Sequence, residues 1–421
     1  MVDVHPVTIE LNGQRKTYTA LFQTGEEFQP GWQSVLKAAY RHSELRCGCN
    51  GMGAKRLAVK HYDGSDSFAL ARFSLTGGQH AADCRFHGAD PSQSGLGGYS
   101  AGVIDQRSDG SVKIRLEIGM LQRTDVVAPT LPRKTLNDRA PAAKQSSMKL
   151  LGLLHYLWAE AGLNQWKPSF AGKRKASLTY WWVNNAAENL WAGKVELSHQ
   201  LLLPAFGAET RDAQRNRSRA TAAVQTKHRM VLIAPLAAFT QERYDGMARQ
   251  LKIAGFHGMP IAFMPTGLWE TTVRRFQNAI SAWRGGHGAV VIAQVELKQG
   301  PKGIYASVID LGVMSVTAEF IPVESSYERI VAEKLVAEGR AFVKPMRYDA
   351  GSDQVFPDFI LTDTPRHVPL EVFGRDDATY MCRKEEKRVY YDRQHGKDGW
   401  WSWDASLDRS GLNVPPFPAR A

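Results

Sequence analysis

The stretch VFPDFILTDTPRHVPLEVFG, residues Val355–Gly374, reads as two β-strands joined by a turn-rich connection. The strands are expected over Val355–Leu361 and Val368–Phe373, and each carries one acidic residue, Asp358 and Glu371. Carboxylates are depleted in strand interiors because they pack poorly on a half-buried pleated surface. Two acids on adjacent strands therefore raise the question of a chemical role.

A helix is predicted on each side of these strands. Ser325 followed by Glu328 is a capping-box pattern, which predicts a helix start. Glu328 shares the apolar face of that helix with residues three, four and seven positions later, so we expect it to point toward the packed side. AFVKPMRY at 341–348 is read as a short strand and 376–394 as the last helix. The predicted order is helix, strand, strand, strand, helix.

Acidic residues on a helix and on two paired strands, with lysines on the next helix, can form a metal-dependent hydrolytic site. Carboxylate oxygens bind Mg²⁺ or Mn²⁺, the metal activates water and polarises a phosphate, and a lysine stabilises the developing charge. Each acid also has an ordinary interpretation: Glu328 as a helix cap, Asp358 as a strand-end residue, and Glu371 as the partner of an arginine.

The PDF motif, followed on the next strand by LEVFG, resembles the PD-(D/E)xK phosphodiesterases, the restriction-endonuclease-like superfamily. The resemblance implies an αβββαβ core with a Mg²⁺- or Mn²⁺-dependent nuclease site. It implies that Glu328, Asp358, Glu371 and Lys387 are catalytic, with Asp358 and Glu371 holding the magnesium. The usual lysine position holds Phe373, so Lys387 on the following helix takes that role, with Lys384 as the fallback.

The whole chain also resembles a poorly characterised family of bacterial proteins associated with mobile elements. The features that carry this resemblance are CGC with HAADC, LLGLLHYLW, and FVKPMRYD with PDFILTD and EVFG. It implies a bacterial, cytoplasmic protein.

Three of the four cysteines fall in one short window near two histidines. Cys47 and Cys49 on a turn, with His80 and Cys84, have the composition of a structural zinc site, which takes thiolate and imidazole ligands. His87 is the alternative to His80. The competing interpretation is three reduced cysteines packed as small hydrophobic residues. The fourth cysteine, Cys382, stands alone on the last predicted helix and is expected to pack rather than to bind the metal.

Positive charge is concentrated in one quarter of the chain. The net charge is +11, and residues 123–229 contain 17 Lys and Arg against 7 Asp and Glu, a balance of 17 − 7 = +10. Such asymmetry predicts a phosphate-binding surface, although a solvated face has the same composition. The candidate nucleic-acid-binding residues are Lys173, Arg174, Lys175, Arg211, Arg215, Arg217 and Arg219. The run of four arginines at 211–219 is either a phosphate-contacting segment or a mobile loop.

The length of 421 residues predicts several domains in a mixed α/β (α+β) fold. We expect a zinc-binding region at 1–98, a basic, partly helical nucleic-acid-binding region at 99–229, a β-rich region at 230–322 and a restriction-endonuclease-like domain at 323–421. Helices are predicted near 146–162 and 178–193. No signal peptide or membrane span is predicted, so a cytoplasmic protein is expected.

Together these features predict a Mg²⁺-dependent, DNA-cleaving or DNA-processing nuclease of a bacterial mobile element. The alternative is a non-catalytic nucleic-acid-binding or scaffolding protein with a degenerate nuclease fold. If Lys387 cannot reach Asp358 and Glu371 in the folded chain, the non-catalytic alternative is favoured.

Overall fold

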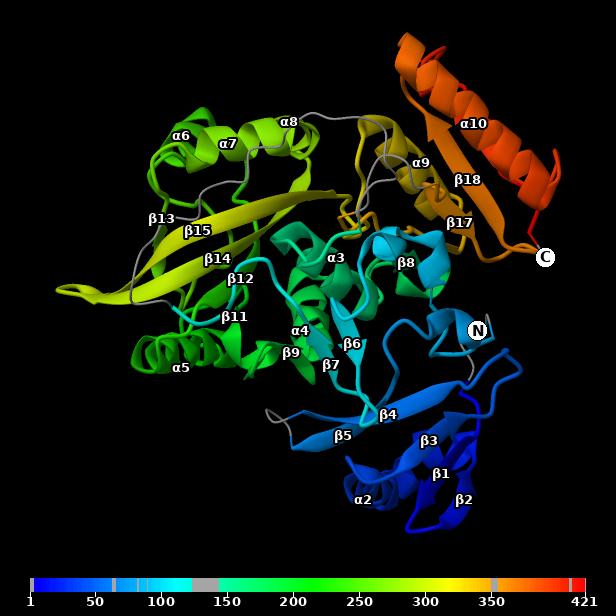
Figure 1. Ribbon diagram of the computed structural model, residues 1–421, viewed down its shortest axis with the longest axis horizontal. Coiled ribbons are helices and arrows are strands. Elements are labelled where there is room, and N and C mark those ends of the chain that lie inside the picture. The colour runs from blue at the N-terminus through cyan, green and yellow to red at the C-terminus, as the bar shows by residue number, and fades with distance from the viewer. Residues whose placement is uncertain are drawn as a thin grey trace.

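The computed structural model describes residues 4–62, 66–81, 83–88, 90–122, 144–349, 355–408 and 411–420. These residues form a mixed α/β fold with several sheets (Figure 1). Short 3-10 turns connect the elements at Glu26–Phe28, Gly77–Gln79, Pro91–Gln93, Gly95–Gly98, Pro168–Phe170 and Leu197–Gln200.

The N-terminal sheet is antiparallel throughout, in the order β2-β1-β3-β4-β5. Alternate residues of β1, Val7 and Ile9, are buried, as the two-residue period of a strand requires. They pack with Trp32 and Leu36 of α2. The elements are β1 (Val7–Leu11), β2 (Gln14–Tyr18), α1 (Ala20–Thr24), α2 (Gln29–Ala39), β3 (Glu44–Cys47), β4 (Arg56–Tyr62) and β5 (Ser67–Arg72).

The central part of the chain builds two further sheets, in the orders β10-β9-β7-β6 and β11-β12-β14-β15-β13. The strands of the smaller sheet are β6 (Ile104–Gln106), β7 (Val112–Ile114), β9 (Leu190–Ala192) and β10 (Val195–Glu196). Those of the larger sheet are β11 (Leu201–Leu202), β12 (Met230–Pro235), β13 (Ile261–Phe263), β14 (Gly288–Gly300) and β15 (Gly303–Val316).

Both faces of the larger sheet are covered by helices. Along β12, Met230 and Leu232 belong to the core formed with α5, α7 and α8, whereas Val231 and Ile233 belong to the core formed with α3 and α4. The central strand is therefore apolar at consecutive positions. The helices are α3 (Leu150–Glu160), α4 (Ala176–Ala187), α5 (Arg211–Thr226), α6 (Gln241–Gly246), α7 (Leu268–Arg275) and α8 (Gln277–Arg284).

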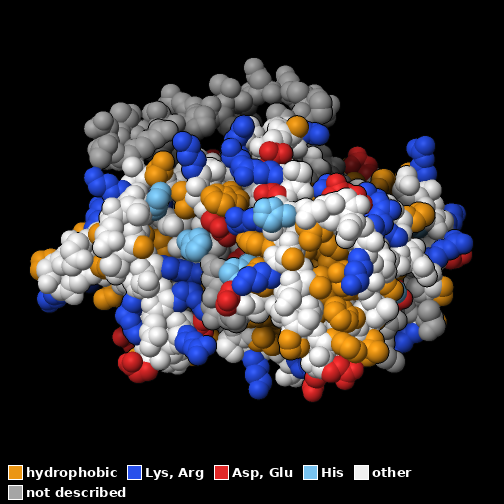
Figure 2. Space-filling view, turned by 90° about the horizontal axis from the view of Figure 1, so that it is seen from below, with side chains coloured by type: hydrophobic (Ala, Val, Ile, Leu, Met, Phe, Trp, Pro, Cys, Tyr) orange, Lys and Arg blue, Asp and Glu red, His pale blue; other side chains and the backbone are white. Residues whose placement is uncertain are grey.

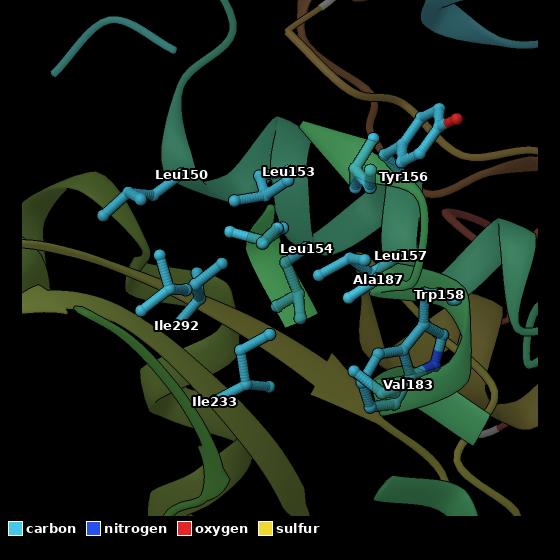
Figure 3. Close-up of a cluster of buried hydrophobic side chains, with 14 of the residues drawn as sticks. Leu150, Leu153, Leu154, Tyr156, Leu157, Trp158, Val183, Ala187, Ile233 and Ile292 are labelled. Atoms are coloured by element: carbon cyan, nitrogen blue, oxygen red, sulfur yellow. The ribbon is translucent and has the colours of Figure 1, made fainter. Parts of the chain in front are cut away.

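Helix α3 is buried along most of its length. Its leucines and Trp158 contact Val183 of α4 and Ile233 and Ile292 of the sheet (Figure 3). A helix that is apolar on nearly every side is expected to be surrounded by other elements. Gly162, which follows the helix, adopts φ +69°, the left-handed conformation that favours glycine at a helix end.

The C-terminal sheet has the order β19-β18-β17-β16-β8, and its last two strands, β18 and β19, are parallel. The chain order α9, β16, β17, β18, α10 matches the predicted helix, strand, strand, strand, helix, and β19 follows. The elements are β8 (Gln165–Trp166), α9 (Ser326–Ala337), β16 (Phe342–Val343), β17 (Phe359–Leu361), β18 (Val368–Phe373), α10 (Ala378–His395) and β19 (Trp401–Asp404).

Three local predictions differ from the structure. Strand β17 begins at Phe359, so Asp358 immediately precedes the strand. Helix α4 ends at Ala187 because Asn189 adopts a left-handed φ of 61°, and the rest of the expected 178–193 helix contains β9. The arginine run is an α-helix, capped by the Thr210 side chain, so the mobile-loop interpretation is wrong.

Two short strands connect parts of the chain that are distant in sequence. β8 pairs with β16, and β11 pairs with β12. β8 and β11 both belong to the expected 99–229 region in sequence, yet each completes a sheet formed mainly by later residues. The predicted domain boundaries stay predictions. Among the residues described above, no helix is long and apolar enough to cross a bilayer.

Candidate functional site

Asp358 is held against strand β18 by two hydrogen bonds. Its backbone N–H donates to the Leu370 carbonyl oxygen over 3.0 Å, and its Oδ2 accepts from the Val372 N–H over 2.8 Å. Leu370 and Val372 flank Glu371 in sequence. The register of the β17–β18 pair therefore brings the Asp358 and Glu371 carboxylates into one neighbourhood.

Glu371 is the most buried acid of this neighbourhood, with 1% of its surface exposed. Lys387 Nζ contacts its Oε1, and the Tyr391 hydroxyl donates to its Oε2 over 3.1 Å. Burial raises the pKa of Glu371 to about 8, and the negative charge of Asp358 adds to the rise, while Lys387 opposes it. The buried Glu371 carboxylate lies beside the half-buried Asp358 carboxylate, and two acids that repel one another would be stabilised by a cation between them.

Glu328 reaches the same neighbourhood from α9. It is buried on the apolar face of the helix, as predicted, and the Ser325 hydroxyl caps the helix by accepting from the Glu328 N–H over 3.1 Å. Its Oε2 lies 2.9 Å from Lys344 Nζ and accepts from the Glu324 N–H over 3.0 Å. Burial raises the pKa of Glu328 to about 7, although the Lys344 ammonium favours the charged form.

One cavity of about 640 Å³ connects these groups. Glu328, Asp358, Glu371 and Lys387 all line it. The structure thus brings together all four residues predicted to be catalytic, from α9, the β17–β18 pair and α10.

The structure also distinguishes the two candidate lysines. Lys387 lines the cavity and reaches Glu371. Lys384 is buried and contacts Asp404 of β19 instead. Of the two, Lys387 is therefore the one placed at the acidic pair.

Several residues at the cavity were missed by the sequence analysis. Lys344 is only 3% exposed, and its one signal was a lysine directly after the apolar residues Ala341–Val343. Arg347 lines the cavity, with Nε 2.7 Å from Glu324 Oε2. The wall opposite the acids comes from α8, and no local pattern indicates that α8 lies there.

Three cysteines and one histidine form a compact, buried cluster whose ligand atoms lie within 4.8 Å of one another: Cys47, Cys49, His80 and Cys84. The Cys47 and Cys84 sulfurs are 3.7 Å apart, and His80 Nδ1 lies 3.6 Å from Cys49 Sγ and 3.8 Å from Cys84 Sγ. Tetrahedral zinc with thiolate and imidazole ligands places such atoms roughly 3.5–3.8 Å apart. The cluster can therefore hold a metal ion such as zinc.

The chemistry of the cluster also fits a metal. A hydrogen bond with the Cys84 thiol lowers the pKa of Cys47, which favours the thiolate form that a metal requires. His80 follows a 3-10 turn, and the Cys84 N–H donates to the Ala81 carbonyl oxygen over 2.9 Å, so a tight turn of the backbone brings these two ligands together.

The other two candidates at this cluster are placed elsewhere. His87 packs its ring against His367, with centroids 5.7 Å apart, and is not part of the converging set. Cys382 is exposed on α10, so the expectation that it packs is wrong.

The profile of a family described as "Protein of unknown function (DUF1173)" matches residues 18–406. The chain belongs to the DUF1173 family. No curated protein and no solved structure matched in the other two comparisons. The region matched to DUF1173 includes both the acidic cavity and the Cys–His cluster. The family description states no activity, so the nuclease, DNA-binding and mobile-element roles stay predictions.

In this DUF1173 member, the three neighbouring candidates for nucleic-acid binding at 173–175 differ in exposure. Lys173 and Lys175 are exposed. Arg174 is buried, and its guanidinium donates to the carbonyl oxygens of Leu163 and Glu319, each over 3.0 Å. Burial lowers the pKa of Arg174 to about 10. Arg174 is therefore poorly placed to contact nucleic acid, because its N–H groups already donate to buried carbonyl oxygens.

The arginines of α5 are likewise unequal. Arg211 and Arg217 are exposed, and Arg215 is paired with Asp212 over 2.9 Å. Arg219 is half-buried and donates to the Leu201 carbonyl oxygen over 3.0 Å. Figure 2 views the side on which α5 lies in Figure 1, and basic side chains there alternate with acidic and uncharged ones.

Proposed function

We propose that this protein is a divalent-metal-dependent nuclease that acts on DNA and that its C-terminal sheet and helices have a restriction-endonuclease-like core. The observation that supports this most is the convergence of Glu328, Asp358, Glu371 and Lys387 in one cavity. The chain order α9, β16, β17, β18, α10, β19 supports it as well.

In this proposal Asp358 and Glu371 hold Mg²⁺ or Mn²⁺. Both are oxygen donors, as these hard cations prefer, and the raised pKa of Glu371 means that a cation would stabilise its charged form. When bound, the cation supplies Lewis-acid polarisation of the phosphate and a more acidic bound water. Among the described residues, the Cys–His cluster brings its ligand atoms close enough to surround an ion by itself, and the three carboxylates do not. We therefore propose that water molecules complete the coordination of the cation at the acidic site.

The remaining groups position and stabilise. Lys387 Nζ, at the edge of the acidic pair, stabilises negative charge that develops on the scissile phosphate. Tyr391 orients the Glu371 carboxylate through its hydroxyl. Lys344 compensates the charge of Glu328, so that a third carboxylate is kept close to the cavity without an unpaired buried charge.

The test is divalent-dependent cleavage of DNA by the wild type and by Asp358→Asn and Glu371→Gln. We expect Mg²⁺ or Mn²⁺ to raise the unfolding temperature of the wild type and to support cleavage, because a ligand of the folded state stabilises it. Both variants should lose both effects. Glu385→Gln, at an exposed position of α10, is the matched control. A wild type that neither cleaves nor gains stability with either cation would favour the non-catalytic, nucleic-acid-binding alternative.

A further inference from the structure

The cavity at the acidic cluster has a second wall that constrains the shape of what can enter. Four residues of α8 line it together, because positions three and four residues apart lie on one face of a helix: Gln277, Asn278, Ser281 and Ala282. The Asn278 amide donates to the Glu324 carbonyl oxygen over 3.2 Å. This bond joins α8 to the start of α9, so the acids are recessed beside a protein wall.

The reacting groups lie deep in this space. Glu371 is 1% exposed and Glu328 6% exposed, although both line the cavity. The cavity is about 640 Å³ and opens to solvent, so a phosphate and the nucleotides beside it can enter. A duplex is a stiff rod, whereas an unpaired strand bends easily, so an unpaired strand reaches the recessed acids more readily.

The rim has the chemistry that recognises an unpaired strand. Arg347 and Arg375 line the cavity and are each about half or more exposed, with side-chain exposures of 48% and 70%. Tyr327 and Tyr380 also line it, and the Arg375 guanidinium lies over the Tyr380 ring, 5.6 Å from its centroid. Cations beside aromatic rings bind single strands because the phosphates meet charge and the unstacked bases meet rings.

We infer that the substrate of this site is single-stranded DNA, or an unpaired segment of DNA, which enters between α8 and the acidic wall. This inference rests on the proposed nuclease function. It names Arg347 and Arg375 as phosphate-positioning residues and α8 as the wall that excludes a paired duplex.

The experiment compares one labelled oligonucleotide, alone and annealed into a blunt duplex, with the full-length protein and Mg²⁺ or Mn²⁺. We expect the free strand to be cleaved at least ~tenfold faster, since pairing adds the cost of unstacking before the strand can enter. Ser281→Trp, which fills the cavity from α8, should reduce cleavage of the free strand while leaving the divalent-dependent gain in unfolding temperature unchanged. Glu242→Trp, exposed on α6, is the matched control.

The possible outcomes distinguish a failure of the single-strand inference from a failure of the proposed nuclease function. Equal cleavage of strand and duplex by the wild type overturns the single-strand assignment and keeps the nuclease. No cleavage of either, with no divalent-dependent stabilisation, overturns both. The wild-type comparison does not depend on how well the tryptophan variant folds.

Discussion

Lys387 is the residue whose role can be tested most sharply, because the chain supplies a second lysine on the same helix. Lys387→Ala should reduce cleavage roughly 100- to 1,000-fold, the usual effect of removing one donor to developing charge. The gain in unfolding temperature with Mg²⁺ should remain, because a lysine does not ligate the cation. Lys384→Ala is the comparison, since Lys384 contacts Asp404 outside the cavity lining.

If Lys384→Ala abolishes cleavage in a folded protein and Lys387→Ala does not, the assignment of the two lysines is reversed. Parallel melting curves for both variants, with and without the cation, distinguish lost chemistry from lost stability.

His155 predicts how stability depends on pH. It is buried in α3 and accepts a hydrogen bond from the Tyr348 N–H over 2.9 Å, which requires the neutral imidazole. Burial lowers the pKa of His155 from 6.5 to about 4. The unfolded chain therefore takes up this proton near pH 6.5 and the folded chain only near pH 4. The resulting stability is fully present above pH 6.5 and is lost as the pH falls toward 4, by roughly 3 kcal/mol.

The measurement is the free energy of unfolding by denaturant between pH 4 and pH 8, for the wild type and His155→Asn. Asparagine keeps an acceptor near the position of Nδ1 but does not titrate. The difference between the two curves isolates His155 from the carboxylates of raised pKa, which act with the opposite sign. A difference that does not change with pH would contradict the assignment.

At the scale of an element, the Cys–His cluster joins β3, the following turn and the 3-10 turn that ends at His80. We predict one zinc ion per chain. Cys49→Ser should lower metal content and unfolding temperature together, because metal-binding energy at such a site is also folding energy. Metal analysis of protein purified without added zinc, with melting curves, provides the measurement.

Cys382→Ser is the control for this experiment, since that thiol is exposed and outside the cluster. An unfolding temperature that is unchanged after complete chelation of a metal-loaded protein would mean that the cluster does not stabilise the fold.

At the scale of the whole molecule, the net charge of +11 and its concentration between residues 123 and 229 predict DNA binding that weakens steeply with salt. Part of this region, 123–143, lies outside the described residues. Changing Arg211, Arg215 and Arg217 to Glu should weaken binding with little dependence on base sequence. Arg219 is left in place because it donates to the Leu201 carbonyl oxygen and its loss would disturb the fold.

Titration of labelled DNA at several salt concentrations measures both the affinity and the slope. The control is the same number of reversals at exposed basic residues outside the region, Arg15, Arg274 and Lys302. Equal losses in the two triple variants would show that α5 makes no special contribution to binding.

Local pattern was sufficient where neighbouring residues decide the outcome. The strand β18 over Val368–Phe373, the helix start at Ser325 and the inward direction of Glu328 follow from short-range periodicity and capping. The Cys–His ligand set also followed from spacing and side-chain chemistry, because few residues in this chain can hold a soft metal.

Tertiary structure decided what depends on segments far apart in the chain. Arg174 and the lysines beside it are alike in sequence, yet Arg174 is buried because carbonyls from residues 11 and 145 positions away surround it. Lys387 was preferred to Lys384 only by resemblance, and the packing of α10 on β18 and β19 separates their partners.

The sequence by itself therefore determined the acidic strand pair, the capped helix and the Cys–His cluster that could hold a metal, since capping, strand period and side-chain chemistry can each be read from the sequence. The cavity that these acids line required the folded molecule. Its second wall is α8, more than 70 positions before Asp358 in sequence, which packs on the larger sheet through Ile280 and Trp283 and contacts Glu324 through Asn278. No periodic pattern reports such a contact, because it arises only when two separately packed sheets and their helices meet.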